Sequence, residues 1–399
     1  MGMSIDPAGL RQRAAAVAPE MVELRHELHR NPETRFKETD TARTIRAFLS
    51  GMRVEVLPPL IGTDTVALLR GSAPGRNILL RADIDALPLE DKSGRPWHSM
   101  RGGRSHACGH DGHIAMLLGA AKLLDGMADE LSGSVRFVFQ PAEEEEGGGK
   151  LMVEKGLLDA EPRPEAAFAL HGWAGMPALS VGAAGGPVMA AADMFTLTVR
   201  GRGGHGALPH RAADPVLAAA QLVTALQSVV SRSVDPLEPA VLSVCAINGG
   251  HASNVIPDEV TLEGTVRYFE PPLRRLIAER MEQIAAGICS ANGCTHALTY
   301  KDGYIPLVND ERMVRFARGV AEGLFGAGSW DESSPRTMGA EDFAYYLEKV
   351  PGALIRLGLG EEWPRLHSPQ FDFNDEAIET GISLLAGLAL EFCATGAAR

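Results

Sequence analysis

The sequence predicts an α/β protein that carries a second, smaller α+β domain as an insertion. Three observations support this fold class. Short apolar runs of strand length alternate with longer segments of helical period up to about residue 186. Between residues 195 and 300 the order becomes strand, helix, strand, strand, helix, strand, which is a split βαβ pattern. The alternating pattern then returns, so we expect residues 1–186 and 302–399 to form one discontinuous domain around an insert at 187–301.

The composition narrows the class of protein. A chain of 399 residues with 45% hydrophobic residues can bury a sizeable core in two domains. Its formal charge of −13 argues against nucleic acid or an anionic membrane as the main partner. The five cysteines are scattered without a CxxC pair, which favours a reducing compartment. Neither a signal peptide nor an uncharged apolar stretch of about 20 residues is visible, so we expect a cytoplasmic protein.

Two helices are expected near the N-terminus. Apolar residues recur with helical spacing between residues 19 and 29, and Asn31-Pro32 should end that segment. A second helix is expected from about residue 38 to residue 49. His26 and His29 lie on the first helix among several charged side chains, so we expect both imidazoles at the surface.

Two acidic residues follow a strand in the next part of the chain. Strand-like runs are found at residues 65–69 and 77–82. Asp83 and Asp85 come directly after the second run, where α/β proteins commonly build their sites. Their side chains should share a direction, because strand geometry has a period of two. A solvated turn would explain the same two residues, so the pattern alone leaves both interpretations open.

The densest group of reactive side chains lies at residues 106–113, which read HACGHDGH. This stretch holds one thiol, three imidazoles and a carboxylate, and thiolates and neutral imidazoles are preferred ligands of zinc-like cations. The apolar run at 114–121 predicts a buried helix directly after it. Histidines that cap a helix beside a buried cysteine are the alternative interpretation.

Residues that can bind metal also follow two later strands. The strand expected at 134–140 leads into the four glutamates Glu143–Glu146 and then three glycines. This context favours a βα turn in which one glutamate binds metal and a neighbour acts as a general base. A solvated acidic loop is the alternative. A further strand at 166–170 should place His171 at its C-terminal end, and so many strand ends with such residues favour a shared site.

The insert contains a glycine-rich loop at residues 201–206, directly after an expected strand. It does not match GxGxxG, so a dinucleotide site is not expected. His205 in this loop could contact a substrate or be an ordinary exposed loop residue. Beyond the insert we expect three helices and one strand, namely helices at 313–324, from 338 and at 376–392, and a strand at 353–358.

Six motifs, in this order, resemble the M20 metallopeptidase family: RADIDALPL, HACGHDGH, FQPAEEEEGGG, GRGGHGALPH, SNVIPDEV and LHSP. They look like its amidohydrolase branch, which includes hippurate hydrolases, N-acyl-amino-acid deacylases and plant auxin-conjugate hydrolases. The resemblance covers roughly residues 18–395. It implies a mixed-sheet catalytic domain with two divalent metal ions (Zn, Mn, Co or Ni). It also implies that the insert is a lid that forms the interface of a homodimer or tetramer, with hinges near Gly186 and Lys301.

The resemblance further implies roles for individual residues. The metal ligands would be Cys108, His110, Glu144, His171 and His367. The general base would be Glu143 and the orienting carboxylate Asp85, although the run of four glutamates leaves the register open by one or two positions. The lid residues would be His205, which matches a histidine that reaches the active site of the partner subunit, and the substrate contacts Asn254 and Arg267. Asp83 stands where the wider family often has a histidine ligand, and Cys108 fits as its replacement.

The activity implied by the resemblance is hydrolysis of the amide bond of an N-acyl amino acid. The acyl group would be acetyl, or aromatic as in hippurate, and the products a carboxylic acid and a free amino acid. Glu143 would take a proton from the attacking water and pass it to the leaving amine. A dipeptidase, an aminopeptidase or an N-carbamoyl-amino-acid hydrolase of the same family is an alternative. So is a metal-dependent binding protein without turnover, which a base beside the metal ligands disfavours.

Overall fold

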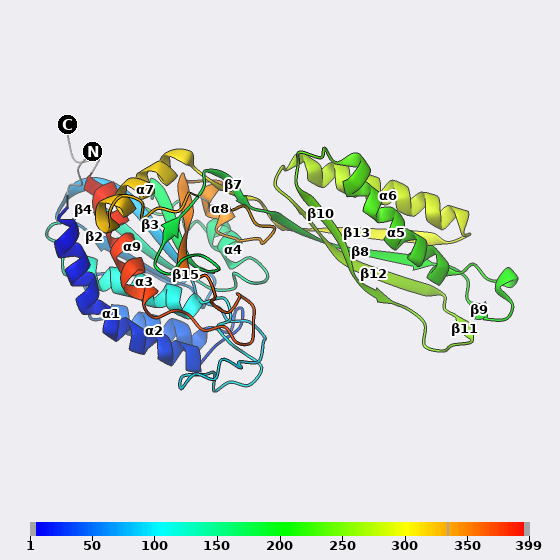
Figure 1. Ribbon diagram of the computed structural model, residues 1–399, viewed down its shortest axis with the longest axis horizontal. Coiled ribbons are helices and arrows are strands. Elements are labelled where there is room, and N and C mark those ends of the chain that lie inside the picture. The colour runs from blue at the N-terminus through cyan, green and yellow to red at the C-terminus, as the bar shows by residue number, and fades with distance from the viewer. Residues whose placement is uncertain (1–4, 333–334, 395–399) are drawn as a thin grey trace. The chain divides into compact units, whose positions relative to one another are not determined.

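The computed structural model describes residues 5–332 and 335–394, which form two compact units (Figure 1). The second unit comprises Pro187–Leu307 and Arg336–Glu341, and the first unit comprises the rest of the described chain. The insert that we expected at 187–301 begins where this second unit begins and ends before Leu307. Strands β7 (Gly186–Met189) and β14 (Leu307–Asn309) lie at two points where the chain passes between the units.

The first unit is built on a seven-stranded sheet. Its strands, in order across the sheet, are β1 (Glu55–Val56), β2 (Thr65–Arg70), β4 (Ser132–Gln140), β3 (Ala73–Asp83), β5 (Ala166–Ala174), β15 (Gly352–Gly360) and β6 (Val181–Gly182). The central strands β4, β3, β5 and β15 run parallel, whereas β1, β2 and β6 are antiparallel to their neighbours. Strand β3 is buried from Ile78 to Asp83, as expected for a strand covered on both faces. The predicted mixed sheet is confirmed.

Helices pack around this sheet within the same unit. They are α1 (Pro7–Arg30), α2 (Thr39–Leu49), α3 (His110–Asp125), α4 (Gly148–Glu154), α7 (Glu311–Phe325), α8 (Ala344–Leu347) and α9 (Ala377–Ala394). Helix α1 begins at Pro7, well before the predicted start at residue 19, because Asp6 caps its first turn by accepting a bond from the amide of Ala8. It ends at Arg30, as the Asn31-Pro32 pair predicts. The helix expected from 338 opens only at Ala344.

Helix α9 is apolar on all sides and lies in the core of the first unit. Its length and composition would allow it to cross a membrane, but 89% of its 18-residue length is buried inside the protein. Helices α1, α3 and α7 pack against it, so contacts with protein account for its apolar surface (Figure 1). Helix α3 is buried almost throughout, which gives the residues at its N-terminus a rigid support.

The second unit is a four-stranded antiparallel sheet covered on one face by two helices (Figure 1). Its strands, in order across the sheet, are β10 (Ala240–Asn248), β12 (Glu259–Tyr268), β8 (Ala191–Arg200) and β13 (Thr295–Tyr304), and its helices are α5 (Pro215–Ser233) and α6 (Pro272–Ala291). In β8 the buried residues Phe195, Leu197 and Val199 alternate with less buried ones, so this sheet has one core face. The chain order of these elements is the predicted split βαβ pattern.

The expectation that His26 and His29 lie at the surface is wrong, because both imidazoles are buried. His26 Nε2 lies 2.8 Å from Asp375 Oδ2, and its ring stacks on Trp97 with 3.6 Å between the ring centroids. His29 Nδ1 lies 2.7 Å from Oδ2 of Asp111, a buried residue in the first turn of α3. The charged face of α1 therefore packs against other parts of the first unit instead of meeting solvent.

The buried contact between His29 and Asp111 predicts a pH dependence of stability. Burial alone would lower the pKa of His29, but the charge of Asp111, with hydrogen bonds to Asp111 and Asp91, outweighs burial and the opposing Arg25 and raises this pKa to about 9. A histidine pKa raised above its ordinary value stabilises the fold fully below about pH 6.5, and this contribution is lost as the pH rises through about 9. The advantage of the wild type over His29→Gln in free energy of unfolding should therefore shrink over that range. Urea unfolding of both proteins from about pH 6 to about pH 10 measures it; an advantage that stays constant would contradict the assignment.

Candidate active site and metal centre

The candidate site lies at the carboxyl ends of the parallel strands of the first unit. Asp83 ends β3, Glu143 and Glu144 follow β4, and Cys108 lies just before Gly109, the N-cap of α3. His171 lies within β5, which continues to Ala174, and not at the end of that strand as predicted. This edge of the sheet brings together residues that are far apart in sequence, which is where open α/β sheets bind ligands.

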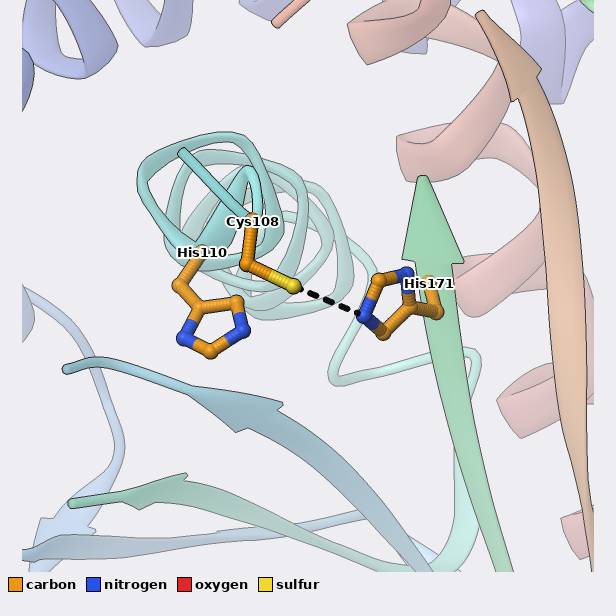
Figure 2. Close-up of side chains that lie close together, drawn as sticks. All are labelled: Cys108, His110 and His171. Carbon is orange, nitrogen blue, oxygen red and sulfur yellow. Dashed lines mark hydrogen bonds between the residues drawn. The ribbon is translucent and has the colours of Figure 1, made fainter. Parts of the chain in front are cut away.

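Cys108, His110 and His171 form the centre of the site (Figure 2). Cys108 Sγ lies 3.5 Å from His171 Nε2, and His110 is in the first turn of α3 beside them. The Nε2 atom of His110 is buried and has no hydrogen-bond partner among the described residues. A buried polar atom of this kind is costly unless something else satisfies it, and a cation would do so.

All five predicted metal ligands belong to groups of side chains whose ligand atoms lie within 4.8 Å of one another. Three of these groups are Cys108 with His110 and His171, Cys108 with Glu144 and His367, and His110 with Glu143 and Glu144. Cys108 belongs to two of the groups, so its sulfur is placed to be a ligand in either of them. The thiol, imidazole and carboxylate donors suit zinc and related divalent ions, so the residues present fit a metal centre.

The buried carboxylates of the cluster shift the pKa values of its thiol and of one imidazole. Burial, followed by the charges of Glu144, Glu143 and Asp83, raises the pKa of the Cys108 thiol well above its ordinary value. Burial would lower the pKa of His110, but the charge of Asp83 and a contact with Asp85 outweigh burial and raise it to about 10. Bound cations would oppose these shifts, because a cation favours the thiolate and the neutral imidazole as ligands.

Asp85 holds the site together through both its carboxylate and its backbone. Its Oδ1 and Oδ2 accept hydrogen bonds from the amides of Glu143 and Glu144, at 3.0 and 3.1 Å. His110 Nδ1 lies 2.8 Å from the carbonyl oxygen of Asp85 and 3.4 Å from Oδ1. Because a carbonyl oxygen only accepts, Nδ1 carries the proton and Nε2 of His110 is left as the ligand atom. The carboxylate of Asp85 therefore holds the amides of the glutamate loop and also lies near His110, while its backbone carbonyl accepts from His110 Nδ1.

The four consecutive glutamates divide into two pairs. Glu143 is buried and the side chain of Glu144 is only 11% exposed. The side chains of Glu145 and Glu146 are at least half exposed, and both form ion pairs with Arg35. This division supports Glu143 and Glu144 as the functional pair.

Neutralising the outer glutamates should therefore have little effect. We expect Glu145→Gln and Glu146→Gln to change kcat by less than about twofold, because exposed ion pairs contribute little and neither carboxylate faces the cluster. Glu144→Gln should instead lower the bound metal content, since it removes a charged ligand. Elemental analysis and kcat of the three variants measure this difference. Metal loss in Glu145→Gln or Glu146→Gln would move the ligand to that position.

His113 links α3 to β5, and both of its ring nitrogens have hydrogen-bond partners within the protein. Its Nδ1 lies 2.6 Å from Asp83 Oδ1, and its Nε2 accepts a hydrogen bond from the amide of Gly172 at 2.8 Å. Asp83 Oδ2 in turn accepts from buried Arg81 at 2.7 Å. This chain of buried bonds fixes the strand beside His171. Sequence reasoning assigned no role to Arg81 or His113; a charged residue inside an apolar strand was the signal available for Arg81.

His367 is held at the more open side of the cluster. Its amide donates to the carbonyl of Ala107 at 2.8 Å, and its Nε2 lies 3.2 Å from Glu144 Oε1. The side chain is 55% exposed, in contrast to the buried ligands. Its φ of 61° places it in the left-handed region, and such backbone strain at a site must be held by its surroundings.

The predicted lid residues lie in the second unit. His205 is exposed in the short strand β9 (Gly204–His205), which pairs with β11 (Val255–Ile256). The amide of Gly206 donates to the carbonyl of Asn254 at 2.8 Å, so His205 and Asn254 occupy neighbouring loops. Arg267 is partly buried near the far end of β12, and its Nε donates to Thr265 Oγ1. Within this unit the structure brings His205 and Asn254 together and leaves Arg267 apart from them.

Comparison with known proteins places this geometry in a family. The family described as Peptidase family M20/M25/M40 matches residues 79–391. The N-acetylcysteine deacetylase of Bacillus subtilis (strain 168) is 37% identical over 373 residues, which cover 93% of this chain and 96% of that protein. The IAA-amino acid hydrolase ILR1-like 4 of Arabidopsis thaliana is 37% identical over 93% of this chain and 85% of its own length.

A solved structure agrees with these sequence relationships. It is a dinuclear metal-binding peptidase of the M20 family from Bacillus subtilis, which is 32% identical with a TM-score of 0.82. The similarity covers 96% of this chain and 99% of that structure. The chain therefore belongs to peptidase family M20/M25/M40 and is a metal-dependent amide hydrolase.

Proposed function

We propose that this protein hydrolyses the amide bond of N-acyl amino acids and releases a carboxylic acid and a free amino acid. Two relatives support this substrate class, since their names specify a deacetylase of N-acetylcysteine and a hydrolase of IAA-amino acid. The observation that carries the proposal is the buried carboxylate of Glu143 beside a cluster of five side chains that could hold metal. A protein that only bound its ligand would not need a base at that position.

The residues that would hold two divalent cations are Cys108, His110, Glu144, His171 and His367. When bound, the cations polarise the scissile carbonyl and lower the pKa of water. The mixed donor set suits Zn, Mn, Co or Ni.

Glu143 supplies the proton transfers of the reaction. Its carboxylate takes a proton from the attacking water as the new bond forms between the water oxygen and the carbonyl carbon. It then delivers that proton to the amide nitrogen as the C–N bond breaks, so that the amine leaves neutral and the acyl group leaves as a carboxylic acid. The bond from its amide to Asp85 fixes the start of this side chain.

The second unit would complete the site as a lid in a homodimer or tetramer. His205 would stabilise the oxyanion in the active site of the partner subunit, an effect for which one donor is typically worth about 3 kcal/mol. Asn254 and Arg267 would contact the substrate, with the planar guanidinium gripping its carboxylate through two parallel bonds. We place the enzyme in the cytoplasm as part of the same proposal.

A substrate panel tests the reaction class. We expect release of free amino acid from N-acetyl and N-benzoyl amino acids, and little cleavage of unblocked dipeptides or N-carbamoyl amino acids. Detection of the amino acid and the free acid by mass spectrometry measures all of these reactions at once. Faster turnover of dipeptides would assign the protein to the dipeptidases and aminopeptidases of the family, and faster turnover of carbamoyl compounds to the carbamoylases.

Cys108 gives a chemical test of metal ligation. If its sulfur binds a cation, Cys108 should resist alkylation by iodoacetamide in the metal-loaded enzyme and react after chelation, because the cation holds the sulfur electrons. Because the metal-free thiol is buried and has a raised pKa, both states are labelled at alkaline pH in urea below the unfolding transition. Cys245, which is exposed on β10 in the second unit, is the matched control and should react equally in both states. Peptide mapping of the adducts measures both sites. Equal labelling of Cys108 in the two states would remove it from the ligand set.

A further inference from the structure

Three successive backbone amides at the start of the glutamate loop each donate to a carboxylate. The amides of Glu143 and Glu144 donate to Asp85. The amide of Ala142, directly before them, donates to Glu38 Oε1 at 3.0 Å. Glu38 therefore holds the loop from a part of the chain that precedes every other residue of the site, and none of the roles assigned so far includes it.

The side chain of Glu38 is used for this loop and not for its own helix. Glu38 is the N-cap residue of α2, where a side chain normally accepts a bond from the first turn, yet it makes no such capping bond. Glu33 replaces it, since Glu33 Oε2 accepts from the amide and the hydroxyl of Thr41 at 2.8 and 3.0 Å. Glu33, which lies outside α2, therefore accepts the hydrogen bond from the first turn of this helix, and the Glu38 carboxylate reaches the loop.

The contact between Glu38 and Ala142 is buried, and both oxygens of the Glu38 carboxylate accept hydrogen bonds. Glu38 is 0% exposed, and its second oxygen accepts a hydrogen bond from the hydroxyl of Thr63 at 2.9 Å. Burial and the nearby charge of Asp85 raise the pKa of Glu38 to about 7. Because both of its oxygens accept hydrogen bonds, the Glu38 carboxylate has a fixed position, and it fixes the position of the Ala142 amide as well.

Ala142 is the residue that needs this support. Its φ of 56° lies in the left-handed region, which is disfavoured for any residue with a Cβ. Ala142 is fully buried, and its carbonyl also accepts from the amide of Gly148 at 2.9 Å. Strained backbone at a site persists only when its surroundings fix it, and here the bond to Glu38 fixes the residue directly before the proposed base.

We propose that Glu38 is a positioning residue for hydrolysis: by holding the Ala142 amide it sets the direction in which the Glu143 carboxylate leaves the backbone. The inference rests on the proposed function, since it takes Glu143 as the base. The proposal depends on the length of the side chain at position 38, because the Ala142 amide needs an acceptor oxygen at one distance from the start of α2. The charge of that acceptor is secondary, since an amide N–H also donates to a neutral carbonyl oxygen.

Two conservative variants separate reach from charge. Glu38→Gln keeps the length and an acceptor oxygen, whereas Glu38→Asp keeps the charge and is one methylene too short. We expect E38D to lower kcat by roughly 10- to 100-fold, because a misplacement of about 1 Å can cost that much. KM and metal content should stay within about twofold, and E38Q should stay within about threefold of the wild type in kcat. Glu145→Asp and Glu145→Gln, the same changes at an exposed glutamate of the same loop, are the matched controls and should leave kcat unchanged.

The readouts are kcat and KM on an N-acetyl amino acid, bound metal by elemental analysis, and the melting temperature. Full kcat in E38D, a kcat in E38Q as low as that of E38D, or a loss that follows metal loss would each overturn the inference. If E38D does not fold, Thr63→Val gives the second test, since it releases the other oxygen of Glu38 and should lower kcat in the same direction with KM unchanged; unchanged kcat there would overturn the inference too. A wild-type enzyme that cleaves no acyl amino acid would overturn the proposed function instead, so the two failures are distinguishable.

Discussion

Replacing Glu143 by glutamine should lower kcat by about 10²- to 10⁴-fold, the usual contribution of a positioned acid–base group. The variant keeps the size of the side chain and the amide bond to Asp85, so the loop should keep its conformation. KM should change little, because the proton transfers contribute mainly to the transition state. Steady-state kinetics on an N-acetyl amino acid measure both constants.

Metal content decides what such a loss of activity means. Glu143→Gln should bind as much metal as the wild type, because the predicted ligands do not include Glu143. Glu144→Gln is the matched control, with the same chemical change one residue later, and it should lose metal. If Glu143→Gln loses metal while Glu144→Gln keeps it, the assignment of base and ligand within the glutamate pair is reversed.

Mixing two inactive variants should restore activity if His205 acts in the active site of the partner subunit. Glu143→Gln and His205→Ala homodimers should each be nearly inactive, the second by about 10²- to 10³-fold in kcat for the loss of an oxyanion donor. After random exchange of subunits, half of the dimers are mixed, and each mixed dimer holds one site with an intact Glu143 and an intact His205. Activity should therefore return to about a quarter of the wild-type value in a two-fold symmetric dimer.

If mixing restores no activity, the result contradicts the action of His205 in the active site of the partner subunit. When His205 acts within its own chain, every site in the mixed dimer lacks either the base or the histidine, so no activity returns. His210→Ala, an exposed histidine of the neighbouring 3-10 turn, is the control: it should be fully active alone, and after mixing with an equal amount of Glu143→Gln it should give half of the wild-type activity, because half of the sites then lack the base. Exchange is verified by native mass spectrometry of differently tagged subunits.

Elements with strong hydrophobic periodicity could be predicted from the sequence, whereas positions set by distant partners could not. The buried strands and the order of elements in the second unit follow from local patterns. The buried state of His29 depends on Asp111, which lies 82 positions further along the chain. The charges around His29 in α1 resemble a solvated face, and no local signal distinguishes a buried ionic cluster from such a face.

The candidate site shows the same limit at the level of single residues. The ligand-type residues stood out as a pattern, and the family resemblance supplied their roles. The division of the glutamate run depends on Arg35, which draws Glu145 and Glu146 outward, and on Glu38 and Asp85, which hold the inner amides. These contacts join segments more than 50 positions apart, so spacing alone left the register open.

The most direct test of the account is metal-dependent release of a free amino acid from an N-acyl amino acid. The enzyme is stripped with a chelator, titrated with each of Zn, Mn, Co and Ni, and assayed on N-acetyl and N-benzoyl substrates at every step. We expect no activity in the stripped enzyme and a rise that saturates at two metal ions per chain for at least one of these metals. Binding of two metal ions per chain with no turnover of any acylated substrate would contradict the account and favour a binding protein.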